Sequence, residues 1–172
     1  MKRWLPFAAF CVLLVFLYVG LFRDPREVPS PFIGRPAPAF VLPVVERPGN
    51  TFSPEQARGR SWLLNVWAPW CTTCQKEHLF LMQVAATGVP VYGLNWKDQD
   101  REAAAMLARM GNPYVLNADD RDGRVGIDWG VTGVPETFVI DAEGIIRMKH
   151  SGPINERIWK RKFVPLLHAL DS

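Results

Sequence analysis

The stretch SWLLNVWAPWCTTCQKEH, residues 61–78, contains the pattern that decides the fold. Residues 61–68 form a nearly continuous apolar run of strand length, which is typical of a strand buried on both faces of a sheet. After Cys71 the spacing of buried positions becomes three and four, as on one face of a helix. The members of that face are Cys74, His78, Leu81, Met82 and Ala85. The stretch therefore predicts a buried strand that leads through two cysteines into a helix.

The rest of the chain predicts further strands that alternate with helices. We expect a short hairpin that turns at Pro48-Gly49, and a C-terminal helix over residues 154–170 that is interrupted at Pro165. The other expected elements are strands over residues 89–96, 113–117, 136–141 and 145–150, a helix over residues 100–111, and a loop with a short helix over residues 119–129. This order predicts an α/β layer fold with a mixed sheet.

The N-terminus carries an apolar segment that predicts a membrane anchor. Residues 1–3 hold two positive charges and residues 4–22 hold none. At about 1.5 Å per residue, such a helix would nearly cross a hydrocarbon core. A cleavable signal peptide is the alternative, but bulky residues follow the run where a cleavage site needs small ones. The charges before the span favour a cytoplasmic N-terminus (residues 1–3) and a domain outside the cytoplasm.

Composition places one folded domain after this anchor. Residues 23–38 contain five prolines, which is typical of a semi-rigid linker, and residues 39–172 remain for the domain. The chain has 172 residues and a hydrophobic content of 48%, which is enough for a real core. Its net charge of +3 comes from scattered basic residues, so the sequence indicates no nucleic-acid partner.

Three kinds of chemistry compete for Cys71 and Cys74, because Cys11 lies inside the apolar segment and reads as a small hydrophobic residue. A structural zinc site normally needs four ligands, and no second cysteine pair is present. A structural disulfide across so short a loop would contribute little stability. Redox chemistry is therefore favoured, and no metal is expected.

The position of the pair suggests a role for each thiol. A cysteine at the first turn of a helix faces unpaired backbone N–H groups, which favour the thiolate. Cys71 is therefore the predicted nucleophile. Cys74 lies one turn deeper and can attack the mixed disulfide that Cys71 forms. A strand, a CxxC pair and a helix together are typical of a thioredoxin-like protein.

Two segments resemble one protein family. LNVWAPWCTTCQKEH (residues 64–78) and GVTGVPETFVIDAEGIIRMKHSGPI (residues 130–154) are similar to the CcmG/DsbE family, the membrane-anchored thioredoxin-like proteins of cytochrome c maturation, within the wider TlpA-like group. GRPAPAFVLP (residues 34–43) and YGLNWKD (residues 92–98) extend the resemblance. It implies a thioredoxin-like fold with an N-terminal hairpin and a central insertion, preceded by one transmembrane helix.

The resemblance also implies a function. It predicts a periplasmic reductant, held in the bacterial inner membrane by a single span, that reduces apocytochrome c CxxCH disulfides or a partner's mixed disulfide before haem attachment. The implied partners are apocytochrome c, haem-lyase components of the CcmH and CcmF kind, and a membrane thiol-reductase donor of the DsbD or CcdA kind. No cofactor is implied.

Carried over residue by residue, the resemblance makes Cys71 the attacking thiol and Cys74 the resolving thiol of a redox-active disulfide. Pro135 matches the family's cis-proline loop, which lies against the dithiol and offers backbone, beside Val134, to a substrate strand. An ordinary trans-proline before a strand is the alternative.

Glu77 and Glu136 match acidic positions near the dithiol in this family. A negative charge there disfavours the thiolate and makes the pair more reducing. Either carboxylate could also accept the proton of Cys74. Simple surface charge is the alternative for both residues.

One residue departs from the family pattern. Proline commonly follows the first cysteine, whereas Thr72 stands there in this chain. Threonine restores a backbone donor and adds a hydroxyl, so we expect a somewhat more acidic Cys71 and a changed redox potential. Trp70 is expected to shield Cys71 or to meet a partner, whereas Trp67 and His78 are expected to pack in the core.

Three alternative functions remain open from the sequence. The chain could be a general TlpA-like periplasmic protein-disulfide reductase, or an oxidant that makes disulfides. It could also be a non-catalytic module that binds apocytochrome by strand addition at the edge formed by Val134 and Pro135.

Overall fold

The computed structural model describes residues 4–21, 31–99 and 101–171. Within them, seven strands form one mixed sheet in the order β2-β1-β5-β4-β3-β6-β7. The strands are β1 (Leu42–Val44), β2 (Arg47–Phe52), β3 (Trp62–Trp67), β4 (Val91–Trp96), β5 (Asn117–Asp120), β6 (Glu136–Ile140) and β7 (Ile146–Ser151). The α/β fold with a mixed sheet that the sequence predicts is confirmed.

Strand β3 lies in the interior of the sheet, between β4 and β6. Every residue of β3 is buried, as its nearly continuous apolar sequence predicts. It pairs in parallel with β4 and antiparallel with β6. Because the dithiol follows β3 directly, these pairings fix where Cys71 begins the next helix.

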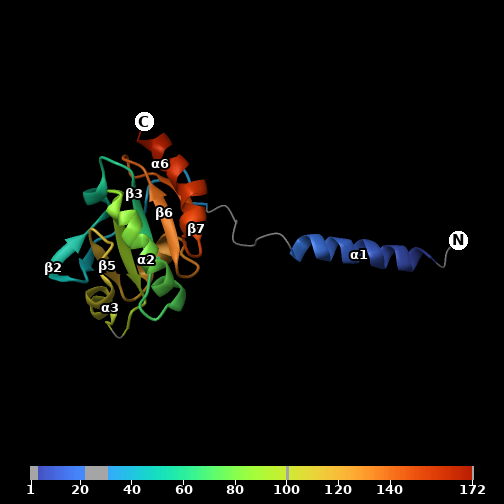
Figure 1. Cartoon of the computed structure of the whole chain (residues 1–172), viewed down its shortest axis with the longest axis horizontal. Helices are drawn as coiled ribbons and strands as arrows, with labels where there is room; N and C mark the ends of the chain where they lie inside the picture. Colours follow the sequence, from blue (N-terminus) through green and yellow to red (C-terminus); the bar gives the residue numbers. More distant parts are fainter. Residues whose placement is uncertain (1–3, 22–30, 100, 172) are drawn as a thin grey trace.

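Helices cover the sheet, and Figure 1 shows α2 (Thr72–Ala86) lying across its strands. Residues of α2, α3 and the C-terminal helices share one buried cluster with Leu63 and Val139. The opposite face of the sheet carries a second cluster built around Phe52, Trp62 and Trp129. The helices that follow β1 are η1 (Pro54–Ala57), α2 (Thr72–Ala86), α3 (Ala103–Met110), α4 (Arg124–Asp128), α5 (Glu156–Ile158), η2 (Trp159–Phe163) and α6 (Val164–Leu170).

The hairpin turn was predicted at the wrong place. Val44 pairs with Arg47, so the chain turns at residues 45–46, and the Pro48-Gly49 pair lies within β2 beside a register irregularity. Tertiary contacts select this turn, because the Val45 N–H donates to the Asn117 carbonyl at 2.9 Å. Proline and glycine thus mark a bulged strand here and not its reversal.

Strand β5 begins later than predicted, at Asn117 in place of residue 113. Its polar sequence NADD carries no strand pattern of its own. It becomes a strand because it pairs in parallel with β4, where Gly93 faces Asn117 and Asn95 faces Asp119.

The interruption expected at Pro165 is present. The C-terminal helix begins as α5, passes through the π-helical turn η2, and restarts as α6 with Pro165 in its first turn. Proline is tolerated there because the first-turn N–H has no helical partner to lose.

The folded domain begins earlier than residue 39. Gly34 N–H donates to the Ile146 carbonyl at 2.7 Å, and Ala37 N–H donates to the Gly144 carbonyl at 2.8 Å. Trp129 Nε1 also donates to the Pro38 carbonyl at 3.1 Å. The second half of the predicted linker is therefore attached to β7 and the loop before it.

The apolar N-terminal segment forms α1 (Leu5–Leu21), which has 17 residues. Across residues 4–21, 31–99 and 101–171, no helix reaches both the length and the apolar character that a membrane crossing requires. Residues 1–3, residue 22 of the expected anchor and residues 23–30 of the expected linker lie outside the described residues.

Candidate active site

Cys71 and Cys74 form a disulfide at the N-terminus of α2. Cys71 is the N-cap residue, and its Sγ accepts a hydrogen bond from the Cys74 N–H at 3.0 Å. This sulfur thus occupies the position where helices favour negative charge. Both cysteines are buried, with 7% of Cys71 and 4% of Cys74 exposed. The pairing expected from the sequence is confirmed, with Cys71 nearer the helix end.

The Val134–Pro135 loop lies against this disulfide. The peptide bond between these two residues is cis, as the resemblance implies. Cys71 Sγ lies 3.7 Å from the Val134 carbonyl oxygen. Residues separated by more than sixty positions in the chain are thus brought together, because β6 pairs with β3 directly after the loop.

Glu77 is buried on the same face of α2 as Cys74, three residues further along the helix. Only 3% of it is exposed, so the alternative of simple surface charge is wrong for this residue. Burial raises the pKa of Glu77 from 4.5 to about 8, and the backbone of Ile154 partly opposes this effect. Glu77 is therefore mostly protonated at neutral pH and can exchange a proton near physiological pH.

A buried polar network that the sequence analysis did not identify surrounds Glu77. Asn65 Nδ2 donates to Glu77 Oε1 at 3.4 Å and to Thr137 Oγ1 at 3.0 Å. Tyr114 donates its hydroxyl hydrogen to Asn65 Oδ1 at 2.9 Å. A single signal pointed to it: an asparagine in the middle of an otherwise apolar strand has to be hydrogen-bonded if it is buried.

Glu136 is buried, but on the other face of the sheet. It pairs with Val66 of β3, whose side chain belongs to the cluster opposite α2. Lys149 Nζ lies 3.0 Å from Glu136 Oε2. Thr132 and Ser151 donate their hydroxyl hydrogens to Glu136 Oε1 at 2.7 and 3.1 Å. The carboxylate is thus paired with a lysine, on the face of the sheet opposite α2.

The two tryptophans beside the site differ in exposure. Trp70 is 54% exposed, and its Nε1 donates to the Lys97 carbonyl at 3.1 Å. Trp67 is buried, stacks on Tyr114, and donates from Nε1 to Asn117 Oδ1 at 3.0 Å. Trp67 therefore packs in the core as predicted, while Trp70 presents a large apolar surface next to Cys71.

Helix α2 also contains His78 and Thr72, two residues that the sequence analysis singled out. His78 is buried and its Nε2 lies 2.9 Å from the Gly111 carbonyl oxygen, which confirms a packed histidine. Thr72 is the first residue of α2 and is exposed to solvent. The Thr72 hydroxyl is therefore accessible to a partner at the mouth of the site.

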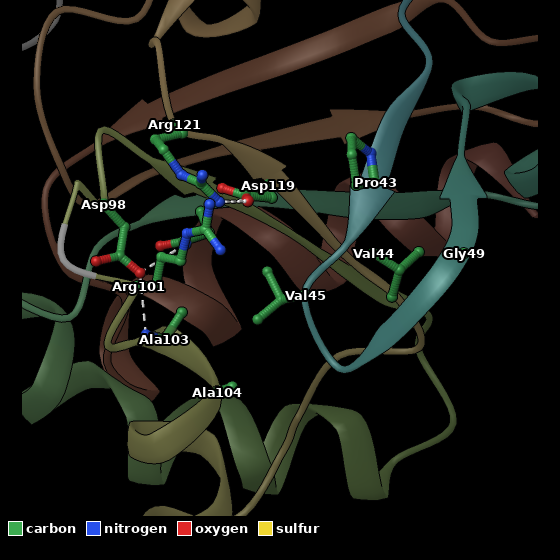
Figure 2. A pocket seen from close by; sticks show the side chains of 11 residues that line it. Pro43, Val44, Val45, Gly49, Asp98, Arg101, Ala103, Ala104, Asp119 and Arg121 are labelled. Atoms are coloured by element: carbon green, nitrogen blue, oxygen red, sulfur yellow. Dashed lines mark hydrogen bonds and ion pairs between the residues drawn. The ribbon is translucent and has the colours of Figure 1, made fainter.

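A cavity of about 470 Å³ lies apart from the dithiol, between the hairpin, the N-terminus of α3 and the end of β5. Figure 2 shows Arg101 and Arg121 beside Asp98 and Asp119 on its wall. Arg121 pairs with Asp119, and Asp98 accepts from the Glu102 and Ala103 N–H groups to cap α3. Neither cysteine lines this cavity. Among the described side chains, no three His, Cys, Asp or Glu residues are grouped so that they could hold a metal ion.

Comparison with known proteins agrees with this site. The family model described as Redoxin matches residues 33–163. The thiol:disulfide interchange protein DsbE of Allochromatium vinosum is 47% identical over 167 residues, which cover 96% of this chain and 92% of that protein. The Escherichia coli K12 protein of the same name is 45% identical over 144 residues, which cover 83% of this chain and 78% of that one.

A solved structure from Chlorobium tepidum has a TM-score of 0.72 at 25% identity, and the match covers 83% of this chain and 100% of that one. The chain therefore belongs to the Redoxin family and, within it, to the DsbE thiol:disulfide interchange proteins, which makes it a thiol-disulfide oxidoreductase of thioredoxin-like fold.

Proposed function

We propose that this chain acts as a reductant of protein disulfides in cytochrome c maturation. The observation that carries the proposal is the buried carboxyl of Glu77, which lies beside the buried resolving residue Cys74 on α2. A buried thiol needs a proton acceptor before it can attack a mixed disulfide. A carboxyl whose pKa is about 8 is ionised in a minor fraction of the molecules at neutral pH, and this ionised form can take that proton and return it.

The reaction starts from the dithiol form. The Cys71 thiolate, stabilised at the helix N-terminus, attacks one sulfur of the substrate disulfide; a mixed disulfide forms and the substrate's other sulfur leaves as a thiolate that takes a proton from water. In molecules whose Glu77 is ionised, Cys74 then gives its proton to the Glu77 carboxylate and attacks Cys71 Sγ. The mixed disulfide breaks, the second substrate thiolate leaves and is protonated, and the Cys71–Cys74 disulfide forms. Two electrons pass from the protein to the substrate.

The substrate in this proposal is the CxxCH disulfide of apocytochrome c, or a mixed disulfide on a haem-lyase component. The substrate strand lies along Val134 and the cis-Pro135, whose loop borders Cys71. Trp70 and Thr72 contact the substrate from the other side of Cys71, since both are exposed beside it. Residues 4–22 anchor the domain to the inner membrane with the active site in the periplasm, where a DsbD- or CcdA-like protein returns the dithiol to its reduced form.

Our proposal for Glu136 differs from that for Glu77. Its ion pair with Lys149 and its bonds to Thr132 and Ser151 favour a role in holding the start of β6, directly after Pro135. Glu136 thereby stabilises the loop that borders the dithiol, and Glu77 is the carboxyl that exchanges a proton with Cys74.

The proposal is tested by trapping mixed disulfides on a Cys74→Ala variant, which cannot resolve them. The variant is built in a Cys11→Ser background, because Cys11 is a free, exposed cysteine that would capture proteins without specificity. The matched control carries Cys71→Ser together with Cys74→Ala. We expect apocytochrome c or a haem-lyase component on the variant and neither on the control. A broad set of secreted proteins would instead identify a general reductase.

Two measurements separate the remaining alternatives. A redox potential near the strongly oxidising value of about −120 mV would contradict the role as a reductant. Full cytochrome c maturation by a Cys71→Ser variant would contradict catalysis altogether and favour a module that only binds apocytochrome.

A further inference from the structure

Asn65 lies between Glu77 and the hydroxyl groups of Tyr114 and Thr137. We propose that Asn65, oriented by these two hydroxyl groups, is a positioning residue that keeps the exchangeable proton of Glu77 on its Oε2 atom. The inference rests on the proposed function, in which Glu77 receives the proton of Cys74. The inference adds Asn65 as the residue that determines which of the two Glu77 oxygens takes up and releases the proton.

The polarity of the network follows from the Tyr114 hydroxyl. Tyr114 is buried, and burial raises its pKa well above 10, with the negative charge of Glu77 acting in the same direction. The hydroxyl therefore keeps its hydrogen at every pH where the enzyme works and donates it to Asn65 Oδ1 at 2.9 Å. The amide oxygen of Asn65 must then face Tyr114, and its nitrogen must face the other way.

The nitrogen of Asn65 faces two acceptors. Its two hydrogens serve Thr137 Oγ1 at 3.0 Å and Glu77 Oε1 at 3.4 Å. An amide nitrogen can only donate, so Oε1 has to accept whether Glu77 is charged or neutral. The carbonyl oxygen of a neutral carboxyl is a better acceptor than its hydroxyl oxygen, so Oε1 is the carbonyl oxygen and the carboxyl hydrogen of neutral Glu77 is on Oε2. Within the described part of the chain, that atom has no partner in hydrogen-bonding geometry.

The surroundings hold the amide in this orientation. Asn65 is 1% exposed and pairs in register with Thr137 across β3 and β6. The ring of Tyr114 is fixed by stacking on Trp67, with ring centroids 5.6 Å apart. Rotating the Asn65 amide by 180° would place its NH2 group against the Tyr114 hydroxyl hydrogen. That hydroxyl hydrogen would then lose its acceptor, and unpaired buried donors are costly and rare in proteins.

Few charged groups act on Glu77. On its own helix the titratable neighbours on the buried face are Cys71, Cys74 and His78. The segment before β5 contributes the hydroxyl of Tyr114. The negative charges of Glu77 and of Glu46 in the hairpin both raise the pKa of this hydroxyl. The segment before α5 contributes a backbone hydrogen bond from Ile154, which lowers the pKa of Glu77. Among the described residues, no ion pair involves Glu77.

The test follows the titration of Glu77 in the reduced full-length chain by NMR of its carboxyl carbon. We expect Asn65→Ala to raise the midpoint by about one pH unit, because the carboxylate loses a donor. Tyr114→Phe keeps the stacked ring and the fold but frees the amide to turn and accept from neutral Glu77, so it also raises the midpoint. Asn95→Ala is the matched control: Asn95 is an equally buried asparagine of the neighbouring strand, and its Nδ2 donates to Asp98.

The same variants are then compared in the pH profile for resolution of a mixed disulfide between Cys71 and a model peptide. We expect its midpoint to move with the Glu77 titration in Asn65→Ala and Tyr114→Phe, and to stay in place in Asn95→Ala. An unchanged Glu77 midpoint in both network variants, or an equal shift in Asn95→Ala, would overturn the inference. The titration needs no substrate, so a failure of the cytochrome c proposal would leave this result unaffected.

Discussion

Glu77→Gln should remove a large pH dependence of stability. In the folded chain the pKa of Glu77 is about 8, against its ordinary value of 4.5 in the unfolded chain. Between these values the folded state holds a proton that the unfolded state has lost. Stability from this group is therefore complete below pH 4.5, falls as the pH rises towards 8, and is constant above it. The difference between the two pKa values corresponds to about 5 kcal/mol in the free energy of unfolding. Glutamine does not ionise, so the Glu77→Gln variant does not lose this stability as the pH rises.

The assay is urea unfolding of the oxidised full-length chain in detergent at several values between pH 4.5 and 9. The free energy of unfolding of Glu77→Gln, relative to wild type, should rise by about 5 kcal/mol across this range. Glu55→Gln, which changes an exposed carboxylate of η1, is the control and should follow wild type. Parallel curves for wild type and Glu77→Gln would refute the argument that burial keeps this carboxyl neutral.

The remaining predictions concern three other sites. Lys149→Met should lower the free energy of unfolding, measured in urea at pH 7, by about 3 kcal/mol, because it leaves the buried Glu136 carboxylate without its ion-pair partner. Adding Glu136→Gln to this variant should recover most of the lost stability. Gly93→Ala should cost about 2 kcal/mol in the same assay, since a Cβ there would overlap the Asn117 side chain; unchanged stability would contradict that packing. Trp70→Ala should change stability by less than about 0.5 kcal/mol, because the indole is more than half exposed, yet speed alkylation of reduced Cys71 by iodoacetamide, because it removes the bulky residue that precedes Cys71 in the chain.

The best-predicted parts of the fold are those whose signal is local. The nearly continuous apolar run of β3, the helical face that starts at Cys71, and the interruption at Pro165 were each visible in a short window of sequence. These features depend on burial of neighbouring side chains and on the missing N–H of proline, which are properties of the residues themselves.

The parts that were misplaced depend on distant partners. Residues 117–120 became β5 because β4 offered a free parallel edge, and the hairpin turned at residues 45–46 because Asn117 bonds the turn. In both cases the local residues are compatible with several conformations. The hydrogen bonds that choose between them come from elements far away in the chain.

The sequence by itself determined the chemistry of the site: two thiols at the start of a helix, after a buried strand, can only serve well as a redox pair. It also placed Pro135 in a cis-proline loop by resemblance. Only the tertiary structure separated the two acidic residues. Glu77 packs against Asn65 and loses its solvation, which raises its pKa, whereas Glu136 points to the other face of the sheet and meets Lys149. Desolvation and charge pairing depend on which strands are neighbours, and only the folded sheet decides that.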